Sequence, residues 1–304
     1  MSAQGTTAFV FAGGSSLGAL QVGMLKALLA RGIVPDFVVG ASAGAINAAY
    51  FAWHPTVAGV AEMNGLWRRL KRNDIFRVSP LGGLWGLLVR RPHMSSADGL
   101  LDVLQATFSS RLLEADGLPC CIITTDMLTG CEYRIRSGLA VPALLASAAI
   151  PGVFPPVRLH GKYLVDGGIT NHTPLSAALD LGAQAIFVMP TGYSCALSAP
   201  PKTAIGIALH GLNLLIAQQL KNDVRHLRSH ADIRVVPPPC PQEVSPYDFS
   251  RAGELIDRAE ELTNQWLDEG VEMVDGVPHQ LPPHTHNDAQ RPYGPHWQQQ
   301  RMDL

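Results

Sequence analysis

Residues 37–52, FVVGASAGAINAAYFA, decide the fold, because in this stretch a short β-prone run passes through a glycine-lined turn directly into a helical segment. The run Phe37 to Val39 predicts a strand, and the alanine-rich segment Ala45 to Ala52 predicts a helix. Between them, the small residues of Gly40-Ala41-Ser42-Ala43-Gly44 allow a sharp turn that presents Ser42 at the helix N-terminus. A strand that leads straight into a helix is one part of a β-α-β unit.

The same order of strand and helix is found on both sides of this stretch. A β-prone run at 8–11 is followed by apolar residues at helical spacing, which end at the glycine of position 32. Further strands are expected at 120–125, 133–135, 157–165 (a pair), 185–189 and 233–236, and further helices at 203–229 and 250–270. This alternation predicts an α/β fold with a mostly parallel central sheet.

Composition and charge exclude several classes of protein. The chain has 304 residues, of which 47% are hydrophobic, so it has enough apolar material for a large core. Only 16% of the residues are charged and the net charge is −2, so neither a nucleic-acid partner nor another polyanion is expected. The five cysteines, which lack metal-type spacing, are interpreted as buried, reduced thiols.

The sequence also limits the expected location of the protein. The first residues lack the basic and long apolar regions of a signal peptide. The longest apolar segment, 204–217, is shorter than the roughly 20 residues that span a bilayer. We therefore expect a soluble, cytoplasmic protein that makes at most transient, peripheral contact with membranes.

One domain is predicted over residues 6–275. Within it, residues 67–98 combine basic residues with Trp67 and other apolar residues, so this segment is interpreted as an inserted cap. Two alternatives stay open for the cap: contact with a lipid surface, or packing on the core. Residues 276–304 are rich in proline, histidine and glutamine and are expected to be a disordered tail, whose histidines are interpreted as solvated and not as a metal site.

Ser42 is the candidate nucleophile. At the start of a helix, the positive end of the helix dipole stabilises the alkoxide and the oxyanion that form during acyl transfer. The flanking glycines, Gly40 and Gly44, fit the G-x-S-x-G pattern of a nucleophile elbow. The alternative is that these small residues only let a strand and a helix cross closely.

A second glycine-rich turn, Gly13-Gly14-Ser15-Ser16-Leu17-Gly18, also lies between a strand and a helix. Its backbone N–H groups are expected to converge on an anion, which makes it a candidate oxyanion hole. A nucleotide is the competing ligand. However, the spacing is not G-x-G-x-x-G and no lysine follows, so no nucleotide partner and no cofactor are predicted.

Asp166 is the candidate base. It stands at the end of a predicted strand, and Gly167 and Gly168 allow the backbone to turn immediately after it. A carboxylate in this position could take the proton of Ser42 directly. Asp166 could instead only cap the turn, and Asp98, Asp116 and Asp126 are rival carboxylates.

A three-member site would need a histidine, for which the candidates are His172, His210, His226 and His230. None of them has supporting sequence context. A dyad of serine and aspartate is therefore preferred.

Taken together, these segments resemble the patatin-like phospholipases. The resemblance covers residues 6–176 and extends to Gly18–Ala30 (GALQVGMLKALLA), to Thr125-Asp126 with Thr129-Gly130, and to Ala146–Pro151 (ASAAIP) with Phe154-Pro155-Pro156. Several segments in the order of the family are far more specific than any single motif.

The resemblance implies a three-layer α/β/α fold and a metal-free serine–aspartate dyad that acts on the acyl esters of phospholipids, lysophospholipids or neutral lipids. Ser42 would be the nucleophile and Asp166 the base, and the N–H groups of Gly13, Gly14 and Ser15 would hold the oxyanion. The chain departs from the family loop G-G-G-x-R/K-G at Ser15 and at Leu17. With the basic residue missing, a strong preference for charged phosphate head groups is not expected.

Two rival functions remain open at this stage. An acyltransferase or thioesterase would use the same fold and nucleophile with a different acceptor or ester. A non-catalytic lipid-binding module would use the fold alone, and the presence of both Ser42 and Asp166 argues against it.

Overall fold

The computed structural model describes residues 5–77, 96–115, 117–192, 204–240, 244–270, 273–274 and 277–278. Most of the predicted cap (78–95), most of the predicted tail (279–304), Asp116 and Cys195 lie outside these residues. The part of the tail that is described, β10 (Val277–Pro278), pairs with β9 (Met273–Val274).

The central sheet is mostly parallel, in agreement with the sequence. Its strands follow the order β5-β6-β3-β2-β1-β7-β8, and β4 pairs with β3. Their bounds are β1 (Thr7–Phe11), β2 (Phe37–Ala41), β3 (Cys120–Asp126), β4 (Glu132–Ile135), β5 (Val157–Leu159), β6 (Lys162–Asp166), β7 (Ala185–Met189) and β8 (Asp232–Val235). The pairs around β1 and β2 are parallel, whereas β4, β5 and β6 form antiparallel pairs at one end of the sheet.

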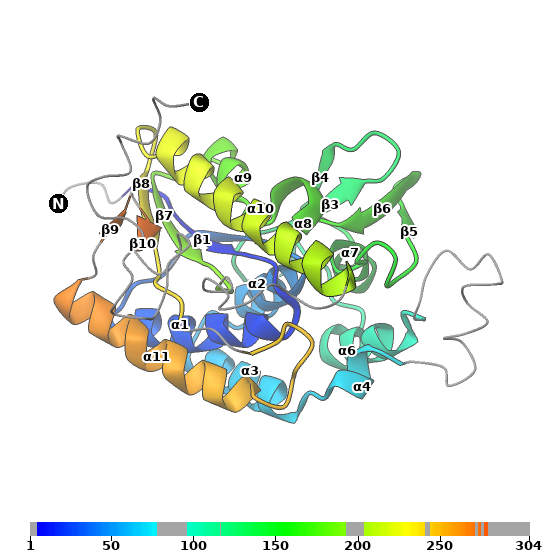
Figure 1. Cartoon of the computed structure of the whole chain (residues 1–304), viewed down its shortest axis with the longest axis horizontal. Helices are drawn as coiled ribbons and strands as arrows, with labels where there is room; N and C mark the ends of the chain where they lie inside the picture. Colours follow the sequence, from blue (N-terminus) through cyan, green and yellow to red (C-terminus); the bar gives the residue numbers. More distant parts are fainter. Residues whose placement is uncertain are drawn as a thin grey trace.

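Helices cover both faces of the sheet and give three layers (Figure 1). One face packs on α1 (Ala19–Ala30), α2 (Ala43–Trp53), α3 (Val57–Arg69), α6 (Asp98–Phe108), α7 (Ala140–Ser147) and α11 (Ala252–Glu269). The other face packs on α9 (Leu175–Asp180) and α10 (Ala204–Leu227). The short helices η1 (Ser15–Gly18), α4 (Arg72–Ile75) and α8 (Gly168–Asn171) lie in the connections.

Alternate side chains along each buried strand point to opposite faces of the sheet and so contribute to two separate cores. In β1, Phe9 and Phe11 face the α1 side, whereas Ala8 and Val10 face the α10 side. All four side chains are fully buried. A strand with helices on both faces has no solvent side, which is why β1 and β2 are continuous apolar runs in the sequence.

Trp67 belongs to the core and does not face a lipid surface. It lies on α3 with 9% of its surface exposed, stacks on Phe249 and donates its indole N–H to Asn47 Oδ1 at 2.9 Å. The basic residues around it therefore flank a packed helix. Cys131 is exposed, which corrects the expectation that all the cysteines are buried.

The strand register brings the two candidate residues to one row of the sheet. Ala41, at the end of β2, pairs with Ile123 of β3, and the next residue of β3, Thr124, pairs with Asp166 at the end of β6. Ser42 follows Ala41 directly. Because β6 is antiparallel to β3, its last residue turns back toward the end of β2, and the two side chains meet across β3.

Candidate active site

The turn at Ser42 is shaped by the close approach of main-chain segments. Ser42 has φ 55° and ψ −127°, a conformation that a residue with a side chain rarely adopts. A Cβ atom on Gly40 would lie 2.4 Å from the carbonyl oxygen of Gly44, and one on Gly44 would lie 2.4 Å from those of Phe11 and Ala12. Only glycine fits at both positions, so the turn can form with Ser42 at its tip.

Ser42 and Asp166 are in direct contact. The Ser42 hydroxyl donates a hydrogen bond of 2.7 Å to Asp166 Oδ2, and each residue is 7% exposed. The other carboxylate oxygen, Oδ1, accepts the N–H of Gly168 at 2.7 Å. The carboxylate is thus oriented from one side by the backbone and presents its second oxygen to the serine.

Burial changes the acidity of Asp166. It raises the pKa of the carboxyl to about 6, although the hydrogen bonds from Ser42 and Gly168 oppose the shift. The carboxylate is therefore still ionised at neutral pH but is a stronger base than an exposed aspartate. A pKa near the working pH suits a general base.

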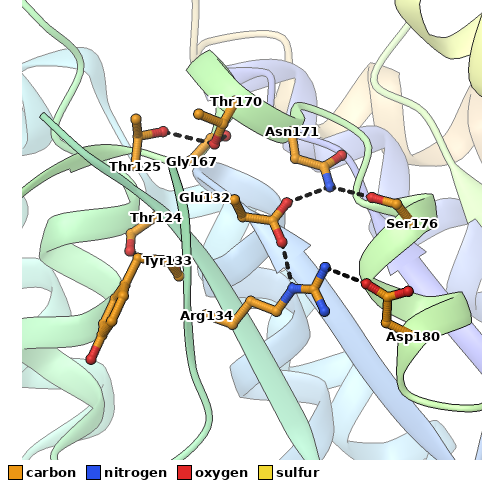
Figure 2. Close-up of polar contacts among 10 residues, drawn as sticks. All are labelled: Thr124, Thr125, Glu132, Tyr133, Arg134, Gly167, Thr170, Asn171, Ser176 and Asp180. Atoms are coloured by element: carbon orange, nitrogen blue, oxygen red, sulfur yellow. Dashed lines mark hydrogen bonds and ion pairs between the residues drawn. The ribbon is translucent and has the colours of Figure 1, made fainter. Parts of the chain in front are cut away.

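Side-chain hydrogen bonds hold the segment that follows Asp166 (Figure 2). Thr125 Oγ1 donates to the carbonyl of Asp166 at 2.9 Å and lies 2.9 Å from Thr170 Oγ1. Asn171 donates to Glu132 Oε2 at 2.6 Å and to Ser176 Oγ at 3.0 Å. These bonds tie α8 to the β3–β4 hairpin.

An ion-pair network continues from this point. Glu132 also accepts a hydrogen bond from Arg134, which in turn pairs with Asp180 of α9 at 2.8 Å (Figure 2). At Gly167, a Cβ atom would lie 2.2 Å from the carbonyl oxygen of Ile123, so the turn itself passes very close to β3. The turn that carries Asp166 is therefore held by both main-chain shape and side chains.

The glycine-rich loop lies beside Ser42, but its three predicted donors are not equivalent. The N–H of Gly13 donates to the carbonyl of His172 at 3.0 Å, so it is already used. Among the described residues, the N–H groups of Gly14 and Ser15 have no hydrogen-bond acceptor. Ser15 has φ 53°, so a serine takes the left-handed conformation where the family pattern has a glycine.

Thr191 and Gly18 support this loop. The hydroxyl of Thr191 donates to the carbonyl of Gly13 at 2.5 Å. A Cβ atom on Gly14 would lie 2.3 Å from Thr191 Oγ1, and one on Gly18 would lie 3.2 Å from the Cβ of Ala43. The loop thus needs small residues for its close contacts with both the β7 side and α2.

In the part of the chain that the structure describes, none of the four candidate histidines forms a hydrogen bond with Ser42 or Asp166. His172 lines a cavity beside Ser42, yet its Nδ1 is shielded and without a hydrogen-bond partner among the described residues. Burial lowers the pKa of its imidazole to about 4, so it is neutral at neutral pH. His226 Nδ1 and His230 Nδ1 are engaged with Asn222 and Ser229 on the surface.

The two rival carboxylates that the structure describes, Asp98 and Asp126, lie elsewhere. Asp126 forms an ion pair of 2.7 Å with Lys162, which lowers the pKa of the Asp126 carboxyl. Asp98 begins α6. Of the described aspartates, Asp166 is the one that the structure brings to Ser42.

Two cavities meet at Ser42 and differ in character. The first is almost entirely apolar; its walls come from α2, α3, α6 and the loop after α7, and include Ile46, Met63, Leu100, Phe108 and Phe154. The second contains Asp166, His172, Thr191, Asn213 and Tyr247 together with apolar residues. Ser42, the candidate nucleophile, therefore lies between an apolar cavity and a mixed polar one.

Three residues that contact the site were given no role by sequence reasoning. They are Thr125, Thr191 and Ser147, whose hydroxyl accepts the N–H of Ser42. Ser147 and Thr125 lie within segments that carry the family resemblance, and this is the signal that could have marked them. Thr191 has no such signal, because its contact with Gly13 joins positions that are 178 residues apart.

The described ranges contain neither a metal-type cluster nor a membrane-spanning helix. No group of three or more histidine, cysteine, aspartate or glutamate side chains there is arranged to hold a metal ion. Nor is any helix in those ranges both long enough and apolar enough to cross a membrane.

Comparison with known proteins relates the chain to one family. The model of the patatin-like phospholipase family matches residues 9–179, which is more than half of the chain. A putative patatin-like phospholipase domain-containing protein of Caenorhabditis elegans is 31% identical over 193 residues, 61% of this chain and 17% of that protein. A lysophospholipase of Phaeosphaeria nodorum is 28% identical over 206 residues, 66% of this chain and 13% of that protein.

A solved structure, VipD from Legionella pneumophila, is similar with a TM-score of 0.43 and 14% identity, over 86% of this chain and 67% of that chain. The curated relatives are much longer than the matched region. This chain spans less than a fifth of the length of either relative named above.

Proposed function

Because the chain belongs to the patatin-like phospholipase family, we propose that it is a serine acyl hydrolase that cleaves the acyl ester bonds of lipids. The reaction would be of the phospholipase A or lysophospholipase type, in which a carboxylic ester is hydrolysed. The observation that carries the proposal is the hydrogen bond of 2.7 Å between Ser42 Oγ and a buried carboxylate, Asp166, at a strained turn.

In the first half of the proposed reaction, Asp166 accepts the proton of Ser42 as Oγ attacks the ester carbonyl carbon. The negative charge that develops on the carbonyl oxygen is stabilised by the N–H groups of Gly14 and Ser15 and by the N-terminus of α2. When the tetrahedral intermediate collapses, the C–O bond to the alcohol breaks. The leaving alkoxide takes the proton from Asp166, and an acyl group stays on Ser42.

In the second half, a water molecule gives a proton to Asp166 and attacks the acyl carbon. Collapse of this second intermediate releases the fatty acid, and Asp166 returns the proton to Ser42. An oxyanion donor typically contributes about 3 to 4 kcal/mol to such steps. The N–H groups of Gly14 and Ser15 would therefore lower the reaction barrier by as much as the base does.

The two cavities supply a place for each part of the ester. We assign the acyl chain to the apolar cavity, because burial of each CH₂ group is worth about 0.8 kcal/mol. The alcohol would occupy the mixed cavity, beside Thr191 and Asn213. The membrane or lipid aggregate that holds such a substrate is the proposed partner, and no cofactor is needed.

The test is the Ser42→Ala variant. It should lose hydrolysis of a p-nitrophenyl acyl ester by at least about 10³-fold, as is usual when a nucleophile is removed, with an unchanged circular dichroism spectrum. The wild-type chain should be labelled by a fluorophosphonate probe and the variant should not. Turnover that survives in the variant, or a wild type that is neither active nor labelled, would exclude the assignment.

Product analysis separates hydrolysis from acyl transfer. Fatty acid should be the main product from a lipid ester both with and without an added acceptor alcohol. A new ester as the main product in the presence of the alcohol would assign the chain to acyl transfer instead.

A further inference from the structure

Ser147 touches both halves of the candidate site. It is the last residue of α7 and is fully buried. Its hydroxyl accepts the N–H of Ser42 at 2.9 Å and donates to the carbonyl of Ile123 at 2.6 Å. One hydroxyl therefore joins the residue that follows β2, Ser42, to the last β3 residue that pairs with β2, Ile123.

The backbone next to Ser147 holds the other half. The carbonyl of Ser147 accepts the N–H of Gly167 at 3.2 Å, and the carbonyl of Ala149 accepts the N–H of Asp166 at 3.0 Å. The segment 147–149 thus binds the peptide of the nucleophile through a side chain and the peptides of the base turn through its main chain.

The strained turn explains why such a bridge matters. Ser42 is the N-cap residue of α2 and follows the last paired residue of β2, so neither the helix nor the β2–β3 ladder supplies an acceptor for its N–H, which needs another acceptor in this buried site. If the hydroxyl is removed, the N–H of Ser42 and the carbonyl of Ile123 both lose a partner, and the peptide before the nucleophile is free to rotate. The direction of Oγ toward Asp166 would change with it.

We infer that Ser147 is a positioning residue, which sets the distance and direction between the Ser42 hydroxyl and the Asp166 carboxylate. The inference rests on the proposed function. Ser147 does not line either cavity that meets at Ser42. Its loss should therefore slow the attack of Ser42 and leave the binding of the substrate nearly unchanged.

The experiment compares Ser147→Ala, Ser147→Cys and Ser147→Thr with a matched control, Thr263→Val. Thr263 is also fully buried and its hydroxyl donates to a carbonyl, that of Ala259, at 2.7 Å, but this bond lies within α11. Each protein is measured for its rate of fluorophosphonate labelling, for kcat and KM with a p-nitrophenyl ester, and for thermal stability.

S147A should be labelled about 10- to 100-fold more slowly than the wild type, because small displacements of reacting groups have effects of this size. Its KM should stay within about twofold, since substrate contacts are retained. S147T, which keeps a hydroxyl, should recover most of the labelling rate, and S147C, with a weaker hydrogen-bonding group, should be intermediate. T263V should lose stability without losing rate.

The inference is overturned if S147A is labelled as fast as T263V, or if only its KM changes. Should S147A fail to fold, the order of wild type, S147T and S147C decides the matter, and equal rates in all three would refute the positioning role. A wild-type chain that shows neither turnover nor labelling would instead refute the proposed function, so the two failures are distinguishable.

Discussion

The turn that carries Ser42 and the turn that carries Asp166 are built in different ways. The serine turn requires glycine at positions 40 and 44, because main-chain atoms pack against Gly40 and Gly44 so closely that no Cβ atom fits. The aspartate turn has one such contact, at Gly167, and is otherwise held by hydrogen bonds from the side chains of Thr125 and Asn171 and to the main chain of 147–149.

The difference teaches what each turn tolerates. Added volume at the serine turn must displace a strand or a helix, because protein interiors are closely packed. Loss of one hydrogen bond at the aspartate turn leaves the others in place. We therefore expect a large loss of activity and stability when atoms are added at the serine turn. Removing single hydrogen bonds at the aspartate turn should cause smaller, graded losses. Four predictions test this contrast.

The largest effect is expected from Asp166→Asn. The variant would lose the proposed general base, so kcat/KM should fall by about 10² to 10⁴-fold. It also removes a charge whose burial is unfavourable, so at pH 7.5 the free energy of unfolding should rise, on the order of 1 to 3 kcal/mol. Activity assays and urea unfolding measure the two effects, and a variant that is both active and less stable would contradict the assigned role.

Gly44→Ala should come next. Its new Cβ would lie 2.4 Å from the carbonyl oxygens of Phe11 and Ala12, so the serine turn must shift. Overpacking of this kind costs about 1 to 3 kcal/mol of stability, and a shift near 1 Å lowers activity about 10²-fold. The measurements are thermal unfolding and the rate of labelling.

Gly211→Ala is the control for this prediction. Gly211 lies in α10 and a Cβ atom there would have no neighbour within 4 Å. Alanine should be neutral or stabilising at this position, by up to about 1 kcal/mol. If G44A behaved like G211A, the serine turn would not be limited by space.

The third effect is a dependence on pH. Because the pKa of Asp166 is about 6, kcat/KM should fall tenfold for each pH unit below that value, as the proposed base becomes protonated. The stability need not follow. The raised pKa of Asp166 makes acidification from pH 6 to 4 stabilising, whereas the lowered pKa of His172, about 4, makes acidification from pH 6.5 to 4 destabilising.

These two contributions oppose each other, so activity should be lost on acidification without a matching loss of stability from this pair. His172→Asn removes the destabilising half. Relative to the wild type, its melting temperature should therefore rise as the pH falls from about 6.5 to about 4.5. A constant difference between the two proteins over this range would show that His172 titrates normally in the fold.

The smallest effect is expected from Asn171→Ala. It removes the donors to Glu132 and Ser176 but leaves Thr125 and Gly167 to hold the aspartate turn. The expected cost is about 1 kcal/mol of stability and a fall in kcat/KM of less than about tenfold. Ser176→Ala, which removes only the second acceptor, is the control, and a loss in N171A as large as in G44A would remove the contrast between the turns.

Much of this arrangement could be predicted from the sequence. The strands of the sheet are short apolar runs between turn residues, which local patterns reveal well. The helices α3, α6, α7 and α9 were not predicted. Of these, α7 and α9 are short and apolar, and α6, α7 and α9 have no side-chain cap to mark their start, whereas α3 follows a side-chain cap, Thr56, that was overlooked. That Ser42 and Asp166 touch follows from the register of β2, β3 and β6, which no local pattern contains.

The hydrogen bonding of the glycine-rich loop at 13–18 could not be predicted from the sequence, for another reason. The N–H of Gly13 is taken by the carbonyl of His172, a main-chain group that every residue type possesses. The residue types in the sequence therefore give no sign of such a bond. The role inferred for Ser147 was hidden in the same way, since its partner is the backbone of a residue 105 positions away.

The hydrogen bonds that join the glycine-rich loop to β7 and to Thr191 have a consequence for the newly made polypeptide. Ala12 donates to the carbonyl of Met189, Gln21 donates to both Ala12 and Met189, and Thr191 holds Gly13. A ribosome that has reached residue 180 has already synthesised Ser42 and Asp166, but not β7, to which the loop is bonded. We expect such a truncated product to be inert toward esters, so that chemical competence arrives only with the later part of translation.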